Sequence, residues 1–148
     1  MRGTTLPLII CLLTFPSLTT AHVIEGKVIH IADGDSITVL DSHREEHRIR
    51  IAGIDAPEKG QSFANASRKQ LGELVGGKEV RVEFEKYDRY GRIVGKVWVT
   101  PPDCPTCGKT LDAGLAQITS GMAWWFRRVR ARAVAGGPRT IRVCEAGS

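Results

Sequence analysis

The chain has 148 residues, a length that allows one folded domain. Its formal net charge of +5 at pH 7 is concentrated in residues 127–148, which hold six Arg and one Glu. Residues 22–126 hold fourteen Lys and Arg against fifteen Asp and Glu, so this body is nearly neutral. The composition therefore excludes a uniformly basic domain, and attraction of an anionic partner to the body would depend on a bound divalent cation.

The first 21 residues have the layout of a secretory signal peptide. Met1 and Arg2 supply a positive start, an apolar run covers residues 6–13, and residues 19–21 are small. The alternative is a membrane anchor, but a span needs about 20 apolar residues and this run is much shorter. We expect cleavage after residue 21 and a secreted or periplasmic mature protein without membrane attachment.

Alternation of apolar and polar residues predicts three strands in the first third of the chain. In the third strand, Ile49 and Ile51 share one face. Arg48 and Arg50 share the opposite face, so we expect Arg50 to point away from the buried side. The predicted strands cover residues 23–31, the segment around Ile37 and Val39, and residues 48–54. Turns at residues 33–35 and 41–43 separate them.

Residues 62–75 are predicted to form a helix, because apolar residues recur there near helical spacing. Gly76 and Gly77 would end that helix. Alternation at residues 80–84 and an apolar run at residues 93–99 predict two further strands. The apolar positions of the helix are Phe63, Leu71, Leu74 and Val75.

A last helix is predicted from an apolar stripe that recurs at intervals of 4, 3 and 4 residues. Its members are Leu111, Leu115, Ile118 and Met122. Three strands, a helix, two strands and a helix in one small domain indicate a mainly β (β + α) fold. We expect a five-stranded OB-type barrel capped by helices, spanning residues 22–130.

Acidic and arginine side chains gather in three short segments. Hard cations such as Ca²⁺ and Mg²⁺ prefer carboxylate and main-chain carbonyl oxygens. The planar fork of Arg matches phosphate oxygens two at a time. A metal held by the acids and a phosphate held by the arginines together indicate phosphodiester hydrolysis. The segments are Asp-Gly-Asp-Ser at 33–36, Arg-Ile-Ala-Gly-Ile-Asp-Ala-Pro-Glu at 50–58 and Asp-Arg-Tyr-Gly-Arg at 88–92.

The three segments resemble the staphylococcal nuclease family, because they occur in the family's order and at roughly its spacing. Gln61, which follows the second segment, also matches. Residues 112–126 look like the family's last helix and the segment after it, so the resemblance covers about residues 23–126. It implies an OB-fold and a Ca²⁺-dependent endonuclease that acts on single- and double-stranded DNA and on RNA. In this family the 5′ P–O bond breaks and a 3′-phosphate remains. We expect a monomer.

The resemblance also implies roles at the metal and at the phosphate. Asp35 and Asp55 would be carboxylate ligands of Ca²⁺, and the main-chain carbonyl of Ala56 would be a third ligand. Asp-Gly pairs are common in turns, so the neighbouring Asp33 is interpreted as a turn residue. Glu58 would activate or orient the attacking water.

Arg50 and Arg92 would hold the phosphate and stabilise the charge that builds in the transition state. Arg89 and Tyr90 would lie near the 3′ nucleotide.

Aromatic residues after the last helix suggest a surface on which bases stack. The resemblance assigns this role to Trp124 and Phe126, although Phe126 lacks the hydroxyl of a Tyr and Val129 stands where a Tyr is common. For Trp124 and Trp125 the alternative interpretation is packing at the edge of the barrel.

Cys104 and Cys107 form a Cys-Pro-Thr-Cys segment after the fifth strand. In an oxidising compartment we expect them to form a small disulfide loop. A zinc site would need four ligands, and a thioredoxin-type site would need a βαβ context. The four histidines show no ligand spacing and receive no role.

The tail, residues 131–148, has no helical stripe, and Gly-Gly-Pro at 136–138 would break a helix. It is either a disordered basic arm or the translation of a shifted reading frame.

Two other classes of function compete with the nuclease. One is a module on the same fold that binds nucleic acid without cutting it, and the other is a thiol–disulfide protein. The presence of every expected side chain favours the enzyme; these are Asp35, Arg50, Asp55, Glu58 and Arg92.

Overall fold

The computed structural model describes residues 21–126, which include nearly all of the expected domain. The predicted signal peptide, apart from Ala21, and the predicted tail at residues 131–148 lie outside the described residues. Within residues 21–126, no helix is long and apolar enough to cross a membrane.

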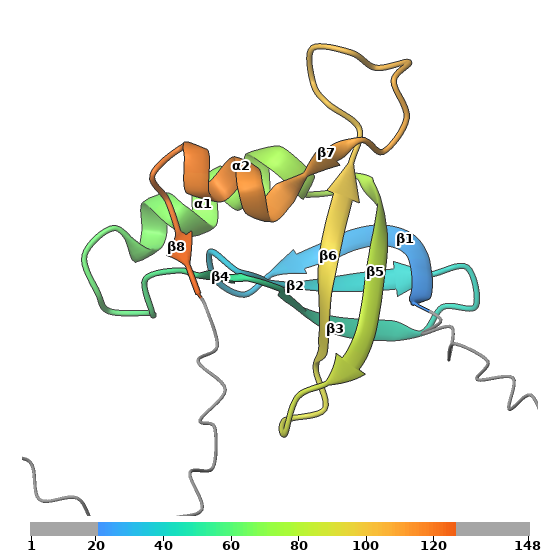
Figure 1. Ribbon diagram of the computed structural model, residues 1–148, viewed down its shortest axis with the longest axis horizontal. Coiled ribbons are helices and arrows are strands. Elements are labelled where there is room, and N and C mark those ends of the chain that lie inside the picture. The colour runs from blue at the N-terminus through green and yellow to red at the C-terminus, as the bar shows by residue number, and fades with distance from the viewer. Residues whose placement is uncertain (1–20, 127–148) are drawn as a thin grey trace, which may run out of the picture.

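Five long strands form a barrel (Figure 1). Antiparallel pairing gives the strand order β3-β2-β1-β5-β6, and a parallel pairing between β3 and β6 closes the sheet. The prediction of a mainly β fold with a five-stranded OB-type barrel is therefore confirmed. The strands are β1 (His22–Ile31), β2 (Ser36–Asp41), β3 (Glu46–Ile51), β5 (Glu79–Tyr87) and β6 (Ile93–Val99).

Branched aliphatic side chains fill the barrel. β-Branched residues suit strands because they pack well on a pleated surface, and each fully buried one contributes roughly 1.5–3 kcal/mol. The predicted faces of β3 are confirmed, since Ile49 and Ile51 are buried and Arg48 and Arg50 are not. The buried strand residues include Val28, Ile37, Val39, Ile49, Ile51, Val80, Val82, Ile93, Val97 and Val99.

The predicted end of the third strand is wrong. β3 stops at Ile51, and after a turn the chain forms the short strand β4 (Ile54–Asp55). Gly53 has φ 77° in that turn, a left-handed conformation that a strand does not contain. β4 pairs with β8 (Trp124–Trp125), so the chain leaves the barrel here and reaches toward the C-terminal segment.

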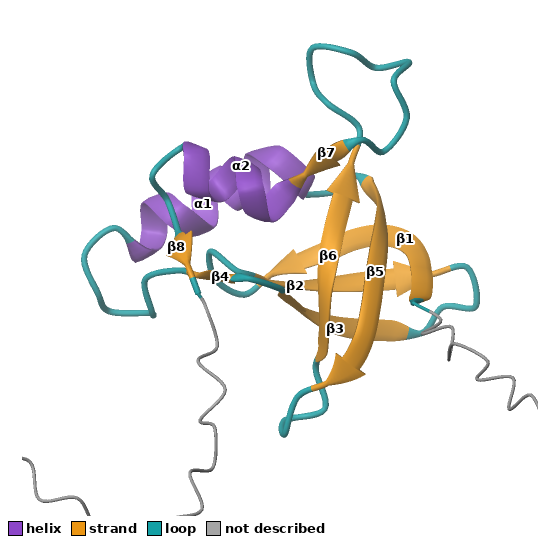
Figure 2. Cartoon of the chain, viewed as in Figure 1, coloured by secondary structure: helices purple, strands orange, loops and turns teal. Residues whose placement is uncertain are grey.

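Two helices lie together at one end of the barrel (Figure 2). The first, α1 (Ala64–Val75), begins two residues later than predicted and buries Ser67, Leu71 and Val75. Phe63 precedes the helix and is 75% exposed, so its predicted place in the buried stripe is wrong. The helix ends before Gly76, as predicted.

The predicted last helix is too long at both ends. Leu111 belongs to β7 (Leu111–Asp112), which pairs with the end of β6, and the helix is α2 (Ala113–Thr119). The Asp112 carboxylate accepts the backbone N–H groups of Gly114 and Leu115 and caps the helix there. That start turns Leu115 to solvent, where it is 57% exposed. The buried face consists of Ala113, Gly114 and Gln117.

Candidate active site

A groove of about 900 Å³ runs along the outside of the barrel where β3, β5 and β6 meet. The parallel pairing of β3 with β6 sets Arg50 opposite Val94, two residues after Arg92. Both arginines line the groove, although 42 positions separate them along the chain. Its other lining residues include Lys86, Tyr87, Arg89, Tyr90 and Phe126.

Arg50 joins the two carboxylates that the sequence analysis assigns to a metal. Its Nη1 forms an ion pair with Asp35, and its Nη2 lies 2.6 Å from Oδ1 of Asp55. Burial alone would lower the pKa of Arg50, but hydrogen bonds and charge from Asp35 and then Asp55 outweigh burial and raise that pKa. The guanidinium is therefore held in its charged form between two acids.

Asp35 is almost completely buried, with an exposed fraction of 2%. Besides Arg50, its Oδ1 accepts the hydroxyl of Ser36 at 2.8 Å. Its Oδ2 accepts the backbone N–H of Ala56 at 3.0 Å. These contacts bring the turn before β2 against the segment after β4, so Asp35, Asp55 and Ala56 meet in space.

Asp33 serves the turn that presents Asp35. Its Oδ1 accepts the backbone N–H of Asp35 at 3.1 Å. Burial first, and the neighbouring Asp35 second, raise the pKa of Asp33. The interpretation of Asp33 as a turn residue agrees with these contacts.

Asp88 shapes the hairpin turn that carries Arg92, a role that the sequence analysis did not assign. Its Oδ1 accepts the backbone N–H groups of Tyr90 at 2.8 Å and Arg92 at 2.9 Å. Its Oδ2 accepts Nε of Arg92 at 2.8 Å, which leaves the two Nη atoms directed elsewhere. Although burial opposes it, these hydrogen bonds keep the pKa of Asp88 below its usual value. The Asx-turn pattern at 88–92 is the sequence signal that points to this role.

Tyr90 stands at the tip of the same turn with 58% of its surface exposed. The guanidinium carbon of Arg89 lies 4.7 Å from the ring centroid of Tyr90, and that of Arg92 lies 5.5 Å from it. Both guanidinium groups therefore lie near the ring of Tyr90, and all three side chains line the groove.

Glu58 lies in the exposed loop between β4 and α1. Its backbone N–H donates to Oε1 of Gln61 at 2.8 Å, and the N–H of Gln61 donates back to its carbonyl at 2.9 Å. None of the hydrogen bonds and ion pairs within residues 21–126 involves the Glu58 carboxylate. Glu58 thus lies two residues after Ala56 in the sequence, and its carboxylate forms no ion pair with Arg50 or Arg92.

The aromatic residues of the last segment lie largely in solvent. Trp124 is 51% exposed, Trp125 68% and Phe126 47%, and the ring of Trp125 lies against Gly53 in the turn before β4. Trp124 is opposite Asp55 in the β4–β8 pairing, and Phe126 lines the groove. A stacking surface is therefore available beside the acids.

The oxygen donors at this end of the barrel fit a hard divalent cation. Asp35 and Asp55 converge on one positive group from two different segments, and Ala56 follows directly. Two acids against one Arg leave a negative charge that a cation would neutralise, and carboxylate and carbonyl oxygens are the ligands that Ca²⁺ prefers.

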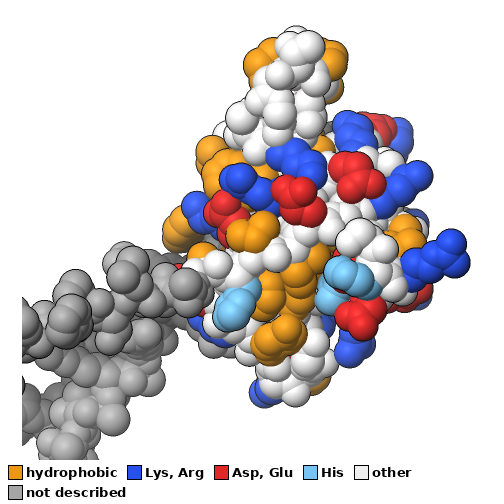
Figure 3. Space-filling view, turned by 90° about the vertical axis from the view of Figure 1, so that its right-hand side faces the viewer, with side chains coloured by type: hydrophobic (Ala, Val, Ile, Leu, Met, Phe, Trp, Pro, Cys, Tyr) orange, Lys and Arg blue, Asp and Glu red, His pale blue; other side chains and the backbone are white. Residues whose placement is uncertain are grey.

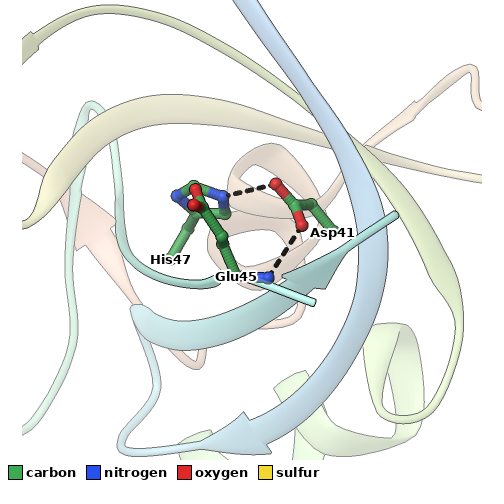
Figure 4. A group of neighbouring side chains, drawn as sticks. All are labelled: Asp41, Glu45 and His47. Carbon is green, nitrogen blue, oxygen red and sulfur yellow. Dashed lines mark hydrogen bonds and ion pairs between the residues drawn. The ribbon is translucent and has the colours of Figure 1, made fainter. Parts of the chain in front are cut away.

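A second group of possible metal donors lies at the other end of β2. Atoms of Asp41, Glu45 and His47 lie within 4.8 Å of one another (Figure 4). The Asp41 carboxylate accepts the backbone N–H groups of His43 and Glu45 and lies 3.0 Å from Nε2 of His47. These contacts are those of a capped hairpin turn, and they give His47 a structural partner that the sequence analysis did not foresee.

Cys104 and Cys107 form a disulfide in the loop between β6 and β7. This loop projects from the barrel, well away from the groove (Figure 1). Figure 3 shows acidic and basic side chains interspersed below the same projection. Neither the disulfide nor that face forms part of the candidate active site.

The chain is similar to known nucleases along most of its length. A family model described as "Staphylococcal nuclease homologue" matches residues 48–136. An "Uncharacterized endonuclease" of Escherichia coli is 37% identical over 123 residues, 83% of this chain and 73% of its own. A "Micrococcal nuclease" of Shigella flexneri is 41% identical over 104 residues, 69% of this chain and 58% of its own. The matched family segment contains Arg50, Asp55, Glu58 and Arg92.

Proposed function

Since the chain belongs to the staphylococcal nuclease family, we propose that it is a Ca²⁺-dependent endonuclease of DNA and RNA. It would hydrolyse the 5′ P–O bond of a phosphodiester and leave a 3′-phosphate. The observation that carries the proposal is the arrangement of Arg50, which joins Asp35 to Asp55 and shares a groove with Arg92.

Asp35, Asp55 and the carbonyl of Ala56 would hold the cation. Ca²⁺ bound there supplies positive charge beside the scissile phosphate, which favours the more negative transition state. Arg50 and Arg92 supply further fixed positive charge on the adjacent strands. Preorganised charge of this kind is usually a large part of catalysis.

Glu58 is the candidate general base. It is exposed in the loop after Ala56, and its carboxylate forms no ion pair within residues 21–126. The attacking water would lose its proton to that carboxylate as its oxygen bonds to phosphorus. The leaving group is then the 5′ oxygen of the next nucleotide.

The substrate would be single- or double-stranded nucleic acid lying along the groove. Tyr90 in the groove and Trp124 opposite Asp55 offer exposed aromatic faces, and base stacking needs only such faces. Arg89 and Lys86 line the groove and can contact phosphates of the strand.

The test is a cleavage assay on single-stranded DNA, duplex DNA and RNA, with Ca²⁺, Mg²⁺ or a chelator. We expect cleavage in Ca²⁺, little in Mg²⁺ because it demands stricter octahedral geometry, and none with the chelator. Mass spectrometry of the products should find 3′-phosphates. A protein that binds DNA but cuts none of the substrates with any metal would be the non-cutting binding module instead.

We further propose that the protein acts as a secreted or periplasmic monomer. The support is the signal-like pattern of residues 1–21 in the sequence. Fractionation of expressing cells, N-terminal sequencing and light scattering of the mature protein test these points. Retention of Met1 in cytosolic protein would contradict the export.

A further inference from the structure

Gln117 is a completely buried polar residue on α2, with an exposed fraction of 0%. Its side-chain Nε2 donates to the carbonyl oxygen of Gly34 at 2.9 Å and to that of Ser67 at 3.1 Å. One amide group thus joins the turn that carries Asp35 to both helices. The partners are 83 and 50 positions away in the sequence.

The backbone of Gln117 holds the segment that leads into β8. Its carbonyl oxygen accepts the N–H of Met122 at 2.9 Å and the N–H of Ala123 at 3.2 Å. The hydroxyl of Ser67 donates to the carbonyl of Met122 at 2.6 Å. Gln117 therefore forms hydrogen bonds both with the segment that leads into β8 and with the turn that carries Asp35.

The turn at Gly34 packs tightly against Ser67 and Ala56. A Cβ at Gly34 would overlap Oγ of Ser67 and would lie 2.8 Å from Cβ of Ala56. Glycine is the residue that permits such an approach. Because Gly34 directly precedes Asp35, its position decides where the Asp35 carboxylate stands.

The amide of Gln117 is not fully satisfied. Its Oε1 is buried and has no hydrogen-bond partner among residues 21–126. A buried acceptor without a partner destabilises the fold. A local cost of this kind is common where a residue serves the geometry of a site.

We propose that Gln117 is a positioning residue for the metal-binding carboxylate Asp35. Its amide sets the position of Gly34, so that Asp35 pairs with the same guanidinium of Arg50 that holds Asp55. Gln117 itself touches neither the substrate nor the proposed Ca²⁺, and the inference rests on the proposed function for the identity of that metal.

The test compares Gln117→Met, which keeps the length but removes the donors, with Val75→Ala as a matched control. Val75 is also fully buried, and its substitution lowers stability without touching the turn. Ca²⁺ affinity is measured by calorimetry, and Tb³⁺ affinity by luminescence, at a temperature where both variants are folded. We expect Gln117→Met to weaken binding by about 10- to 100-fold, the usual effect of losing a partner behind a ligand. Val75→Ala should stay within about twofold of the wild type.

Amide hydrogen exchange gives a readout that needs no metal. The N–H of Ile51 donates to the carbonyl of Asp35 at 2.8 Å, and the N–H of Ala56 donates to its Oδ2 at 3.0 Å. Both amides should lose protection in Gln117→Met but keep it in Val75→Ala. If Gln117→Met does not fold, Gln117→Asn, which is too short to reach Gly34, takes its place.

Wild-type exchange and wild-type Ca²⁺ affinity in a folded Gln117→Met protein would overturn the inference. If the wild type binds no Ca²⁺ but the variant loses protection at Ile51 and Ala56, the positioning role stands and the proposed calcium dependence fails.

Discussion

Nη2 of Arg50 lies 2.6 Å from Oδ1 of Asp55, and Nη1 of the same guanidinium pairs with the buried Asp35. Arg50 therefore pairs with both of the carboxylates that are proposed to bind the metal. A residue proposed to bind phosphate and two proposed metal ligands are in direct contact, so changes at Arg50 should affect both metal binding and catalysis.

Replacing Arg50 by Ala should strengthen Ca²⁺ binding and weaken catalysis. Removal of a positive charge that pairs with the carboxylates of Asp35 and Asp55 should raise Ca²⁺ affinity by about fivefold or more, because a positive charge at this distance repels a cation and occupies its oxygen ligands. Turnover should fall because the phosphate loses a two-point contact. Calorimetry and initial rates on one DNA substrate measure the two effects. Arg50→Lys should restore little turnover, and weaker Ca²⁺ binding in Arg50→Ala would contradict the prediction.

Glu58→Gln should lower turnover by about 10² to 10⁴-fold, the usual contribution of a general base. Ca²⁺ affinity should change less, because the proposed carboxylate ligands are Asp35 and Asp55. Glu79→Gln is a suitable control, since Glu79 is also exposed but lies on β5. Near wild-type cleavage by folded Glu58→Gln protein would show that another group activates the water.

Asp88→Asn should lower turnover by up to about 100-fold, because a small displacement of a catalytic group can cost that much. Asn keeps an oxygen for the backbone of Tyr90 but loses the charge that holds Nε of Arg92. Single-turnover rates at saturating substrate measure the effect. Asp103→Asn, in the exposed loop between β6 and β7, should cut normally. Equal rates in both variants would show that Arg92 does not need Asp88.

Trp124→Ala should weaken binding of single-stranded DNA by about 5- to 150-fold, the range for one base stacked on an aromatic ring. Binding is measured by fluorescence anisotropy at fixed salt, in a Glu58→Gln background that does not cut the probe. Leu115→Ala removes an exposed apolar residue from α2 and should have no effect. Unchanged affinity in Trp124→Ala would place the substrate elsewhere in the groove.

The hairpin between β2 and β3 should depend on pH through Asp41. A hydrogen bond to His47 first, and the backbone N–H of Glu45 next, hold the pKa of Asp41 below its ordinary value of 3.8. A carboxyl group with a lowered pKa in the folded state stabilises the fold above its unfolded pKa and loses this effect as pH falls through its folded value.

Asp41→Asn should therefore lower the free energy of unfolding at pH 7, and the difference from the wild type should vanish as pH falls below 3.8. Urea unfolding at a series of pH values measures this difference, with Asp103→Asn as the control. A difference that stays constant down to the lowest pH would mean that the charge of Asp41 does not stabilise the hairpin.

Local patterns in the sequence predicted the features that depend on one segment alone. Alternation in β3 predicted that Ile49 would be buried and that Arg50 would point to the opposite face, because successive side chains of a strand point to opposite faces. Gly76 marked the end of α1. The apolar stripe beginning at Leu111 misled, because α2 begins only after the cap at Asp112 and buries Ala113, Gly114 and Gln117 instead of Leu115.

The sequence by itself determined the five strands, the three acidic and arginine-containing segments, and the face of β3 on which Arg50 stands. Only the tertiary structure decided that β3 pairs parallel with β6, which brings Arg92 beside Arg50. It alone placed Gln117 against Gly34, 83 positions away. The physical reason is that side-chain direction follows from local backbone geometry, whereas neighbours distant in sequence depend on how the closed barrel and its two helices pack around one core.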